Sequence, residues 1–453
     1  MRFHSFLEMI TYYAENKNPV FIYDEQGEKA ELSYSALAER VSQKAQELKS
    51  CGKTSLGVIC TPSVECIVTI FAAAEAKMQV VMLDEGTSEA NLAKLVKAAD
   101  VDMLWGNDKE TIEALTPHLT DGVEKDAGRI LFFTSGTTSL SKAVILTEQS
   151  LCSSAYNGSA KLPLTSDDKL LCILPLAHVF GFICSLLWGL SCGATVALGR
   201  GARQLMFDCQ YFEPTAVSLV PMLLGFLIKG KLLNDNLKTI LIGAGDCPQN
   251  LLDAASALGK HVCFGYGLTE TSSGVAISVT GDPSAMEVCP DDKIEIAPDG
   301  EILITAPTCI MQGYYKDAVS TAAALKDGVL YSGDIGYIDL DGRLHITGRK
   351  KEMLVLPSGT KIFLPDYERE LSKALENAEL AVILLKEKPV LVIKELSEKK
   401  QEIMDKLGEV MKKLPRAHQL SDVIFTDKPL PRTATGKIKR WEIQKTEEEK
   451  WQK

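Results

Sequence analysis

Between Ser55 and Gly267, short apolar runs rich in β-branched residues alternate with longer runs whose apolar residues recur at helical spacing. This alternation predicts a largely parallel sheet flanked by helices, because a parallel strand pair needs a crossover that a helix usually supplies. We therefore expect an α/β fold for this part of the chain. The runs are SLGVICT, ECIVTIFAAAEA, QVVML, NLAKLVKAA, VDMLW, AVSLVP, MLLGFLIKG, LKTILIGAG, LLDAASALG and HVCFGYG.

The pattern changes after about residue 285, where short alternating strands are joined by Asp-Gly turns. The segments DKIEIAPDGEILITAP and LYSGDIGYIDLDGRLHITG predict a small antiparallel β unit. Beyond Gly348, a charged region carries its own helices and strands, and 453 residues exceed the usual size of one core. We predict a large N-terminal domain, residues 1–348, of mostly parallel sheets flanked by helices plus the small β unit, and a small α+β C-terminal domain, residues 349–453.

Charge and cysteine content argue against several classes of protein. The net charge is −11, whereas nucleic-acid binders usually present a basic face, so we expect no nucleic-acid partner. The same charge gives no general attraction to anionic membranes. The twelve cysteines form no CxxC pair and most lie in apolar runs, which favours buried free thiols over zinc or disulfides. Such thiols are typical of a reducing compartment, and we expect a cytoplasmic protein.

Two apolar segments share features with membrane-targeting or membrane-spanning sequences. The N-terminal segment MRFHSFLEMITYYAENKNP has helical spacing that Glu8 interrupts, and we interpret it as a surface helix rather than a signal peptide. Residues 170–198 contain no Asp, Glu, Lys or Arg and are long enough to span a bilayer. A strand, a turn and a buried helix fit them better, so we expect no membrane span. This segment is interrupted by Pro175, His178, Gly181, Gly189 and Gly193.

The stretch LFFTSGTTSLSKAVI, residues 131–145, joins a predicted buried strand to a loop rich in hydroxyl groups. Ligands of open α/β sheets bind at the carboxyl ends of strands, where this loop would lie. Its hydroxyls and backbone N–H groups could surround an anion, and Lys142 adds a positive charge. The spacing is not that of a Walker loop. By itself, the stretch leaves phosphate binding and an ordinary polar turn both open.

Four further motifs follow this loop along the chain. They are Gly265-Tyr266-Gly267-Leu268-Thr269-Glu270, Tyr331-Ser332-Gly333-Asp334, Gly348-Arg349-Lys350-Lys351-Glu352 and Pro431-Arg432-Thr433-Ala434-Thr435-Gly436-Lys437-Ile438. In this order the five motifs resemble the adenylate-forming superfamily, and most closely its acyl-CoA synthetases and fatty-acid–CoA ligases. In that family a carboxylic acid attacks ATP to give an acyl-adenylate, and a thiol then displaces AMP. The resemblance implies ATP, Mg²⁺ and coenzyme A as cofactors and a mobile C-terminal domain.

The resemblance also implies which residues hold the nucleotide. It places the β- and γ-phosphates at one loop, made of Thr134, Ser135, Gly136, Thr137, Thr138 and Lys142. It places adenine against the turn Gly243-Ala244-Gly245 and the ring of Tyr266, which Gly267 follows. Asp334 would accept hydrogen bonds from the ribose hydroxyls, and Arg349 would lie near the ribose and a phosphate.

Catalytic roles follow from the same resemblance. Thr269 would contact the α-phosphate, and Glu270 would hold Mg²⁺, a hard cation that suits a carboxylate. Lys437 would bridge the acyl carboxylate and the α-phosphate, where charge develops during attack. His178 would lie beside the acyl carboxylate as a gate or hydrogen-bond donor. Lys351 would be a hinge between the two domains.

Several of these residues also have a plain structural explanation. Tyr266 could be a core aromatic residue, and His178 could be a core histidine with satisfied hydrogen bonds. Asp334 could cap a turn. Lys437 could be a solvated lysine of the surface, as most lysines are. The sequence leaves both explanations open at each position.

The sequence departs from the family pattern in three places. Ser139, Ser141 and Ala143 replace the glycine, proline and glycine of the usual phosphate loop, which narrows its backbone conformations. Glu148 stands after Thr147, where the family often has histidine. The C-terminal domain also looks shortened around LAVILLKEKPVLVIKE. The thioester step is therefore less well supported than the adenylation step.

The predicted acyl pocket contains no carboxylate. Residues 174–181, LPLAHVFG, offer none to pair with a substrate ammonium, so an amino-acid substrate is disfavoured. Residues 182–188 and 220–223 would supply apolar walls, which fit a fatty or other apolar acyl chain or an aryl group. Coenzyme A is the expected thiol. Two alternatives stay open: an acyl carrier protein with its phosphopantetheine arm, and a non-catalytic paralogue that binds acyl groups or nucleotide.

Overall fold

The computed structural model describes the chain in eleven segments and divides it into two compact units. The described residues are 1–134, 142–245, 247–280, 282, 285–355, 361–376, 378–386, 388–395, 399–414, 419–432 and 438–451. Unit 1 comprises Met1–Thr134, Lys142–Ser332 and Tyr337–His345. Unit 2 comprises Gly333–Gly336 and the described part of Ile346–Lys453. The predicted boundary at residue 349 lies close to the start of the long segment of unit 2.

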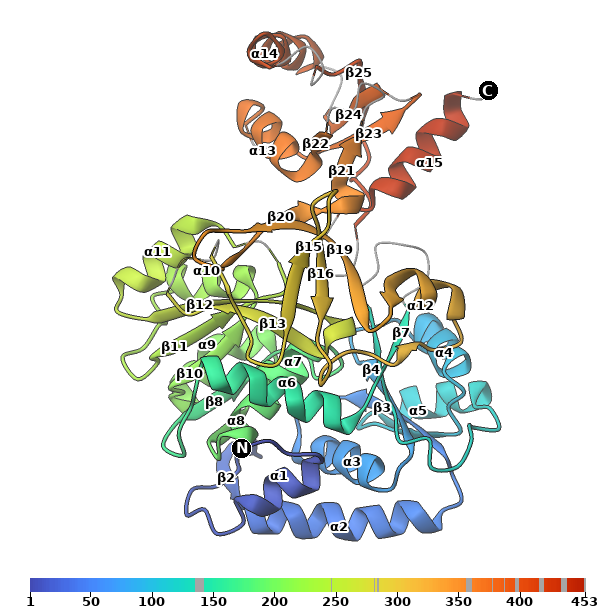
Figure 1. The fold of residues 1–453 in the computed structure, drawn as a ribbon, viewed down its shortest axis with the longest axis vertical. Coiled ribbons are helices and arrows are strands. Elements are labelled where there is room, and N and C mark those ends of the chain that lie inside the picture. The colour runs from blue at the N-terminus through green and yellow to red at the C-terminus, as the bar shows by residue number, and fades with distance from the viewer. Residues whose placement is uncertain are drawn as a thin grey trace. The chain divides into compact units, whose positions relative to one another are not determined.

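Unit 1 begins with helix α1 (Phe6–Tyr12), which packs beside α2 (Tyr34–Ser50) and α3 (Val64–Glu75) (Figure 1). A helix was expected here, but the prediction that it lies on the surface holds for only one of its faces, because the other face is buried. Phe6, Met9 and Ile10 are fully buried, and the ring of Phe6 stacks on Phe71 of α3 at 4.4 Å. Spacing of i, i+3 and i+4 aligns these side chains on one face, which the sequence pattern contained but Glu8 obscured.

The buried Glu148 anchors the start of α1. Its carboxylate accepts a 2.7 Å hydrogen bond from the backbone N–H of Phe6 and lies 3.6 Å from the ammonium of Lys77. Burial raises the pKa of this carboxyl group. Glu148 therefore has a structural role at the place where the family often has histidine.

The larger sheet of unit 1 has nine strands in the order β14-β13-β12-β11-β10-β8-β9-β1-β2. Its centre, from β12 to β1, is parallel, whereas β2, β13 and β14 pair antiparallel at the two edges. The parallel centre confirms the prediction from the strand and helix alternation. The strands are β1 (Phe21–Glu25), β2 (Glu28–Leu32), β8 (Lys169–Cys172), β9 (Thr195–Leu198), β10 (Ala216–Leu219), β11 (Thr239–Ile242), β12 (His261–Leu268), β13 (Ser273–Ser278) and β14 (Glu287–Val288).

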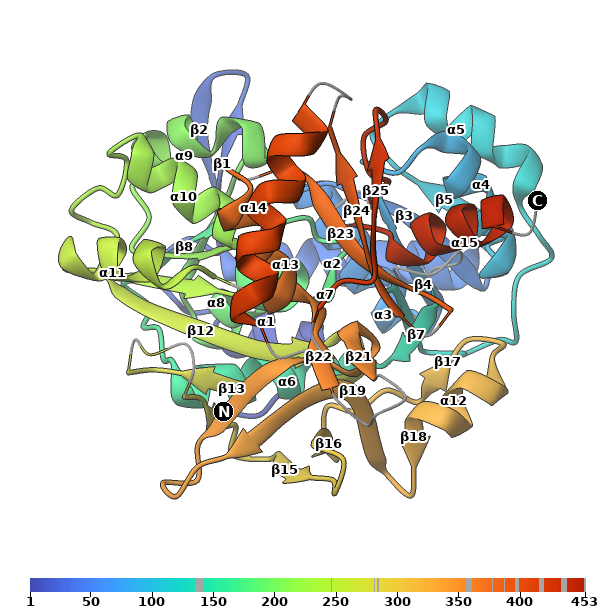
Figure 2. The ribbon, with the colours of Figure 1, turned by 90° about the horizontal axis from the view of Figure 1, so that it is seen from above.

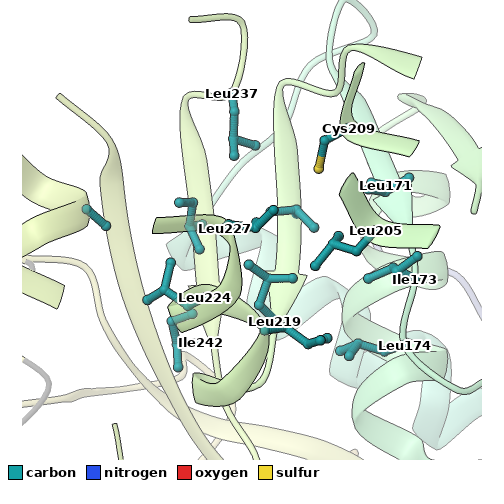
Figure 3. Packing of buried hydrophobic residues seen from close by; sticks show 14 of the residues in the cluster. Leu171, Ile173, Leu174, Leu205, Cys209, Leu219, Leu224, Leu227, Leu237 and Ile242 are labelled. Atoms are coloured by element: carbon teal, nitrogen blue, oxygen red, sulfur yellow. The ribbon is translucent and has the colours of Figure 1, made fainter. Parts of the chain in front are cut away.

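Both faces of this sheet are buried. Ile240 and Ile242 of β11 belong to a hydrophobic cluster with helices α9 (Leu205–Phe212), α10 (Pro221–Lys229) and α11 (Gln249–Ala257) (Figure 3). The residue between them, Leu241, belongs to a second cluster that contains Trp188. Successive side chains of a strand point to opposite faces, so a continuous apolar run fits a strand covered on both sides.

The second sheet of unit 1 has six strands in the order β17-β7-β6-β4-β3-β5. Strands β5, β3, β4 and β6 run parallel, and β7 and β17 add antiparallel pairs. Helices α4 (Glu89–Ala98) and α5 (Lys109–Leu115) lie with this sheet, whereas α9–α11 lie with the first (Figure 2). The strands are β3 (Ser55–Cys60), β4 (Gln79–Asp84), β5 (Met103–Trp105), β6 (Ile130–Phe133), β7 (Ala143–Leu146) and β17 (Gly313–Tyr314).

The uncharged segment 170–198 forms part of the larger sheet and a buried helical stretch. After β8 come α7 (Val179–Phe182), a π-helical turn (Ile183–Leu187), α8 (Trp188–Ser191) and then β9. The expected strand, turn and buried helix are confirmed. Throughout the described part of the chain, no helix combines the length and the apolar character needed to cross a membrane. All twelve cysteines lie among the described residues as free thiols, and eight of them are buried.

The expected antiparallel β unit is a five-stranded sheet in which β15 pairs with β16 and β18 pairs with β19, both antiparallel. Helix α12 (Ala318–Ala324) precedes β18. The strands are β15 (Lys293–Ile296), β16 (Glu301–Thr305), β18 (Leu325–Lys326), β19 (Val329–Ile338) and β20 (Leu344–Arg349).

Unit 2 has the α+β character that its sequence predicts. The antiparallel pair of β23 and β24 is extended by β25, a parallel strand that the sequence analysis did not identify. Residues 440–451, within the charged C-terminal region, form α15, where Glu447 is 7% exposed. The elements are β21 (Met353–Val355), β22 (Lys361–Phe363), α13 (Leu364–Ala374), β23 (Leu380–Leu385), β24 (Lys388–Lys394), α14 (Lys400–Lys413), β25 (Asp422–Thr426) and α15 (Arg440–Trp451).

Candidate active site

The two ends of the predicted phosphate loop are bonded to each other. Thr134 follows β6 and Lys142 precedes β7, and these strands pair antiparallel. The backbone N–H of Thr134 donates to the carbonyl of Lys142 at 2.9 Å, and that of Lys142 donates to the Thr134 hydroxyl at 3.2 Å. The expected buried strand at residues 130–133 is confirmed. Ser135, Gly136, Thr137 and Thr138 lie outside the described residues.

The side chain of Lys142 lies over the ring of Tyr314, with 4.5 Å between its ammonium nitrogen and the ring centroid. The Tyr314 hydroxyl donates a 2.7 Å hydrogen bond to Oε1 of Glu270. Lys142 and Glu270, two predicted site residues, are thus joined through a third residue. Tyr314 lies outside the five sequence motifs, although the Gly-Tyr-Tyr run at 313–315 was a possible signal. Its pairing with β7 could not be inferred from local pattern.

Thr269 and Glu270 lie on a single 3₁₀ turn (Thr269–Thr271) between β12 and β13. The hydroxyl of Thr271 accepts from the N–H of Leu268 at 3.0 Å and can donate to the carbonyl of Ser273 at 2.9 Å. The carbonyl of Glu270 accepts from the N–H of Met311 at 2.8 Å. These bonds hold the turn at the carboxyl end of β12 and leave the Glu270 side chain partly exposed.

The predicted adenine site consists of two neighbouring strand ends. Ile242 of β11 lies beside Phe264 of β12, so the turn Gly243-Ala244-Gly245 leaves the sheet next to Tyr266. A Cβ atom at Gly243 would lie 2.8 Å from the ring of Phe180. A Cβ atom at Gly267 would lie 1.6 Å from the carbonyl oxygen of Ser273, across an irregularity in the β12–β13 register. Position 267 therefore needs glycine, because the obstacle is backbone, whereas a side chain at position 243 would require the ring of Phe180 to move. Tyr266 is 8% exposed, so most of its surface lies in the protein interior.

His178 pairs with an acidic residue that the sequence analysis did not identify. Its Nε2 lies 3.3 Å from Oδ2 of Asp84, and the two side chains are 41% and 31% exposed. Asp84 ends strand β4 of the second sheet, whereas His178 follows β8 of the first and precedes α7. The 41% exposure of His178 excludes the alternative explanation that it is a fully buried core histidine. The signal for Asp84 was its place as the first charged residue after an apolar strand, at the ligand-binding edge of a sheet.

One part of the expected acyl wall is exposed to solvent. In the segment 182–188, Phe182, Leu186 and Leu187 are fully buried. In the segment 220–223, Leu223 is buried but Met222 is 66% exposed. Met222 lies in the first turn of α10 and points away from the core, and its place in an acyl wall stays a prediction.

In unit 2, Asp334 and Arg349 form an ion pair. The Arg349 Nε lies 3.0 Å from Oδ1 of Asp334, whose carboxylate is buried while the guanidinium is more than half exposed. Asp334 lies within β19 rather than at a turn. Lys351 lies in a short 3₁₀ turn (Lys350–Glu352), and its side chain is outside the described part. Lys437 also lies outside it, between Arg432 and Ile438, which form a β-bridge.

Comparisons with known proteins agree with these motifs. A model of the AMP-binding enzyme family matches residues 12–127 and 108–315. The indoleacetate–CoA ligase of Aromatoleum aromaticum is 30% identical over 363 residues, which cover 73% of this chain and 71% of that protein. The 2-succinylbenzoate–CoA ligase of Lactococcus lactis is 27% identical over 452 residues, which cover 91% of this chain and 95% of that protein.

Solved structures show the same fold. The o-succinylbenzoate–CoA synthetase of Bacillus subtilis in complex with its acyl-adenylate intermediate matches with a TM-score of 0.79 and 21% identity, covering 96% of this chain and 97% of that one. ATP-bound MatB of Rhodopseudomonas palustris matches with a TM-score of 0.79 and 19% identity, covering 98% and 99%. The family model spans more than half of the sequence, and the curated relatives are acid–CoA ligases. The chain belongs to the AMP-binding enzyme family and is an enzyme of the acid–thiol ligase type.

Proposed function

We propose that this enzyme uses ATP to convert an apolar carboxylic acid to an acyl-adenylate and pyrophosphate, and then transfers the acyl group to coenzyme A with release of AMP. The observation that carries the proposal is the contact chain from Lys142 through Tyr314 to Glu270. It joins the base of a hydroxyl-rich loop to a partly exposed carboxylate. A lysine attracts phosphate oxygens and a carboxylate binds Mg²⁺, so the pair suits a magnesium–triphosphate ligand.

The donor set fits magnesium bound together with a nucleotide. Among the described residues there is no group of three or more His, Cys, Asp or Glu side chains that could hold a metal. Mg²⁺ in nucleotide enzymes usually takes one or two carboxylates, with phosphate oxygens and water completing its coordination. Glu270 would be that carboxylate, and the metal would reduce the charge of the departing pyrophosphate. The B. subtilis relative has been solved with ATP and magnesium ion, which supports this assignment.

The remaining nucleotide contacts are proposed from the motifs. Thr134 and Lys142, with Ser135, Gly136, Thr137 and Thr138 between them, would hold the β- and γ-phosphates. Thr269 would contact the α-phosphate. Asp334, oriented by its ion pair with Arg349, would accept hydrogen bonds from the ribose hydroxyls. Lys437 would stabilise the charge that develops as the acyl carboxylate attacks.

The acid is proposed to be aromatic. The two curated relatives described above are named for indoleacetate and 2-succinylbenzoate, both of which contain a ring. The predicted acyl segment offers apolar side chains and no carboxylate, which fits an aryl acid and disfavours an amino acid. A fatty acid, the expectation from the motifs, is the second candidate because the same apolar side chains would accept it.

ATP–pyrophosphate exchange tests the first half-reaction. The panel contains indoleacetate, 2-succinylbenzoate, benzoate, medium- and long-chain fatty acids and several amino acids. We expect exchange with at least one aryl acid, weaker exchange with fatty acids and none with amino acids. Glu270→Gln, which keeps the shape but removes the charge, is the matched control and should abolish the signal. A folded protein that binds ATP but exchanges with no acid would instead be the non-catalytic paralogue.

Thioester formation tests the second half-reaction. The best acid of the panel is incubated with ATP and either coenzyme A or a phosphopantetheinylated carrier protein. We expect product with coenzyme A. Product with the carrier protein alone would show that the acceptor is a protein.

A further inference from the structure

The pair of Asp84 and His178 joins the two sheets of unit 1. Oδ2 of Asp84 faces Nε2 of His178 at 3.3 Å, and Oδ1 accepts a 3.0 Å hydrogen bond from the backbone N–H of Gly86. Both oxygens of the carboxylate therefore have defined neighbours, and its orientation is determined from its own strand. The His178 contact lowers the pKa of Asp84, which keeps this carboxylate ionised at neutral pH.

The backbone that carries His178 has little freedom. Its N–H donates to the carbonyl of Pro175 and its own carbonyl accepts from the N–H of Phe182. A Cβ atom at Gly181 would lie 2.2 Å from the Pro175 carbonyl, so the turn closes too tightly for any other residue. The backbone thus determines where the ring begins, and the carboxylate of Asp84 determines how the ring is turned.

The chemistry of imidazole gives this orientation a consequence. A ring that donates from Nε2 to Asp84 has Nδ1 on its other side, and in the neutral ring Nδ1 can only accept a hydrogen bond. A substrate carboxylate can only accept as well. Nδ1 can contact such an anion only when it carries a second proton. Glu85 is a second carboxylate beside Asp84, and burial, with a contribution from the charge of Asp84, raises its pKa.

We propose that Asp84 is the positioning residue for His178, and that the pair binds the carboxylate of the acyl substrate with uptake of one proton by the ring. The inference rests on the proposed function, since it needs an acid substrate at His178. The bound state is an array of Asp84 carboxylate, imidazolium and substrate carboxylate, in which charges alternate. Because binding takes up a proton, affinity for the acid falls as pH rises.

Asp84→Asn keeps the shape of the side chain and removes its charge. We expect it to raise the KM for the acid about tenfold at pH 8 while kcat changes less than about threefold, because a hydrogen bond to a charged group is lost only in acid binding. The KM for ATP should stay the same. His178→Asn changes the other member of the pair and should likewise raise the KM for the acid with little change in kcat.

The chain offers a matched control in a second Asp–His pair. Nε2 of His345 lies 2.8 Å from Oδ2 of Asp339, in the turn between β19 and β20. Asp339→Asn removes the same kind of contact away from the predicted acyl segment. It should leave the kinetics of the acid unchanged.

Two measurements decide the inference. Nitrogen chemical shifts of labelled histidine report the tautomer, and we expect the Nε2–H form of His178 in the wild type, a mixed population in Asp84→Asn and no change in Asp339→Asn. Calorimetry with indoleacetate, in the presence of a non-hydrolysable ATP analogue and in buffers of different ionisation enthalpy, measures proton uptake. We expect uptake approaching one proton at pH 8 in the wild type and less than half of that in Asp84→Asn.

The two arms separate failure of the inference from failure of the proposed function. An unchanged His178 tautomer in Asp84→Asn would overturn the positioning role, whatever the substrate. A changed tautomer with unchanged proton uptake and acid KM would overturn the role in substrate binding. Absence of exchange with every acid of the panel would refute the proposed function, while the tautomer measurement would still decide the positioning role.

Discussion

The hydroxyl of Tyr314 donates a 2.7 Å hydrogen bond to Glu270, and the ammonium of Lys142 lies 4.5 Å from the centre of the same ring. Tyr314 belongs to β17 of the six-stranded sheet, and Glu270 follows β12 of the nine-stranded sheet. Burial and the neighbouring carboxylate raise the pKa of Tyr314, so its hydroxyl remains a donor throughout the neutral range. One aromatic side chain thus holds both the proposed metal ligand and the proposed phosphate-binding lysine.

Tyr314→Phe should weaken binding of magnesium–ATP. The variant keeps the ring under Lys142 and loses only the hydrogen bond to Glu270, a bond to a charged group worth about 1.5–3 kcal/mol. We expect the KM for magnesium–ATP to rise at least about tenfold, and the affinity for Mn²⁺, used as a probe by calorimetry with the ATP analogue, to fall in parallel. Tyr315→Phe removes a similar phenol–carboxylate bond, to Asp100, and should have no effect. Equal effects of the two substitutions would contradict a specific role for Tyr314.

Asp292→Asn should stabilise the protein at neutral and alkaline pH. Burial raises the pKa of Asp292 from 3.8 to about 7. A carboxyl group whose folded pKa is raised contributes stability that is complete below its unfolded pKa and is lost as pH rises through the folded value. The gain in unfolding free energy from the substitution should therefore grow between about pH 4 and 7 and stay constant above, reaching about 1–3 kcal/mol after allowance for partial exposure.

Urea unfolding at several pH values measures this difference. Asp235→Asn, at an exposed position, serves as the control and should follow the wild type. A gain that is the same at pH 5 and pH 8 would mean that Asp292 is not the titrating group.

Lys437→Ala should abolish most adenylation and spare ATP binding. A positioned charge that acts mainly on the transition state is worth about 3 kcal/mol, or a hundredfold or more in rate. Exchange rate and ATP affinity are measured in the same preparation. Lys439→Ala removes a neighbouring lysine that pairs with Glu442 at 3.6 Å, and its exchange should be near normal. Near-normal exchange in Lys437→Ala itself would remove this residue from the mechanism.

Lys351→Pro should separate the two half-reactions. Residues 350–352 form a short 3₁₀ turn just after β20. If the two half-reactions need different placements of the C-terminal domain, a few residues there must change their dihedral angles, and proline restricts φ and removes a donor. We expect pyrophosphate exchange to persist and thioester formation from purified acyl-adenylate to be lost. Lys351→Ala, which removes the side chain without restricting the backbone, should keep both. Equal loss of both reactions in the proline variant would indicate misfolding instead.

The sequence by itself determined the elements and their sidedness. Residues 240–242 of β11, ILI, are all apolar, and the structure buries Ile240 and Ile242 on one face and Leu241 on the other. A strand that is buried on both faces can be recognised from its own sequence, because successive residues point to opposite faces and all of them must be apolar. The antiparallel unit after residue 285 was predicted from a different local pattern, short alternating strands joined by Asp-Gly turns. The motif residues were also visible, since each motif is contiguous.

The tertiary structure decided which residues meet across elements. Tyr314 with Glu270, Asp84 with His178 and Glu148 with the start of α1 each join segments that are distant in the chain. Periodicity tells which face a side chain occupies but not which strand comes to lie beside it, because strand order depends on crossovers and packing over the whole sheet. The same limit hid β25, whose parallel pairing with β24 needs the helix between them, and the burial of Glu447 in α15. From the sequence alone a charged residue is predicted to be exposed to solvent, and only the packing of its helix against the rest of the domain shows that it is buried.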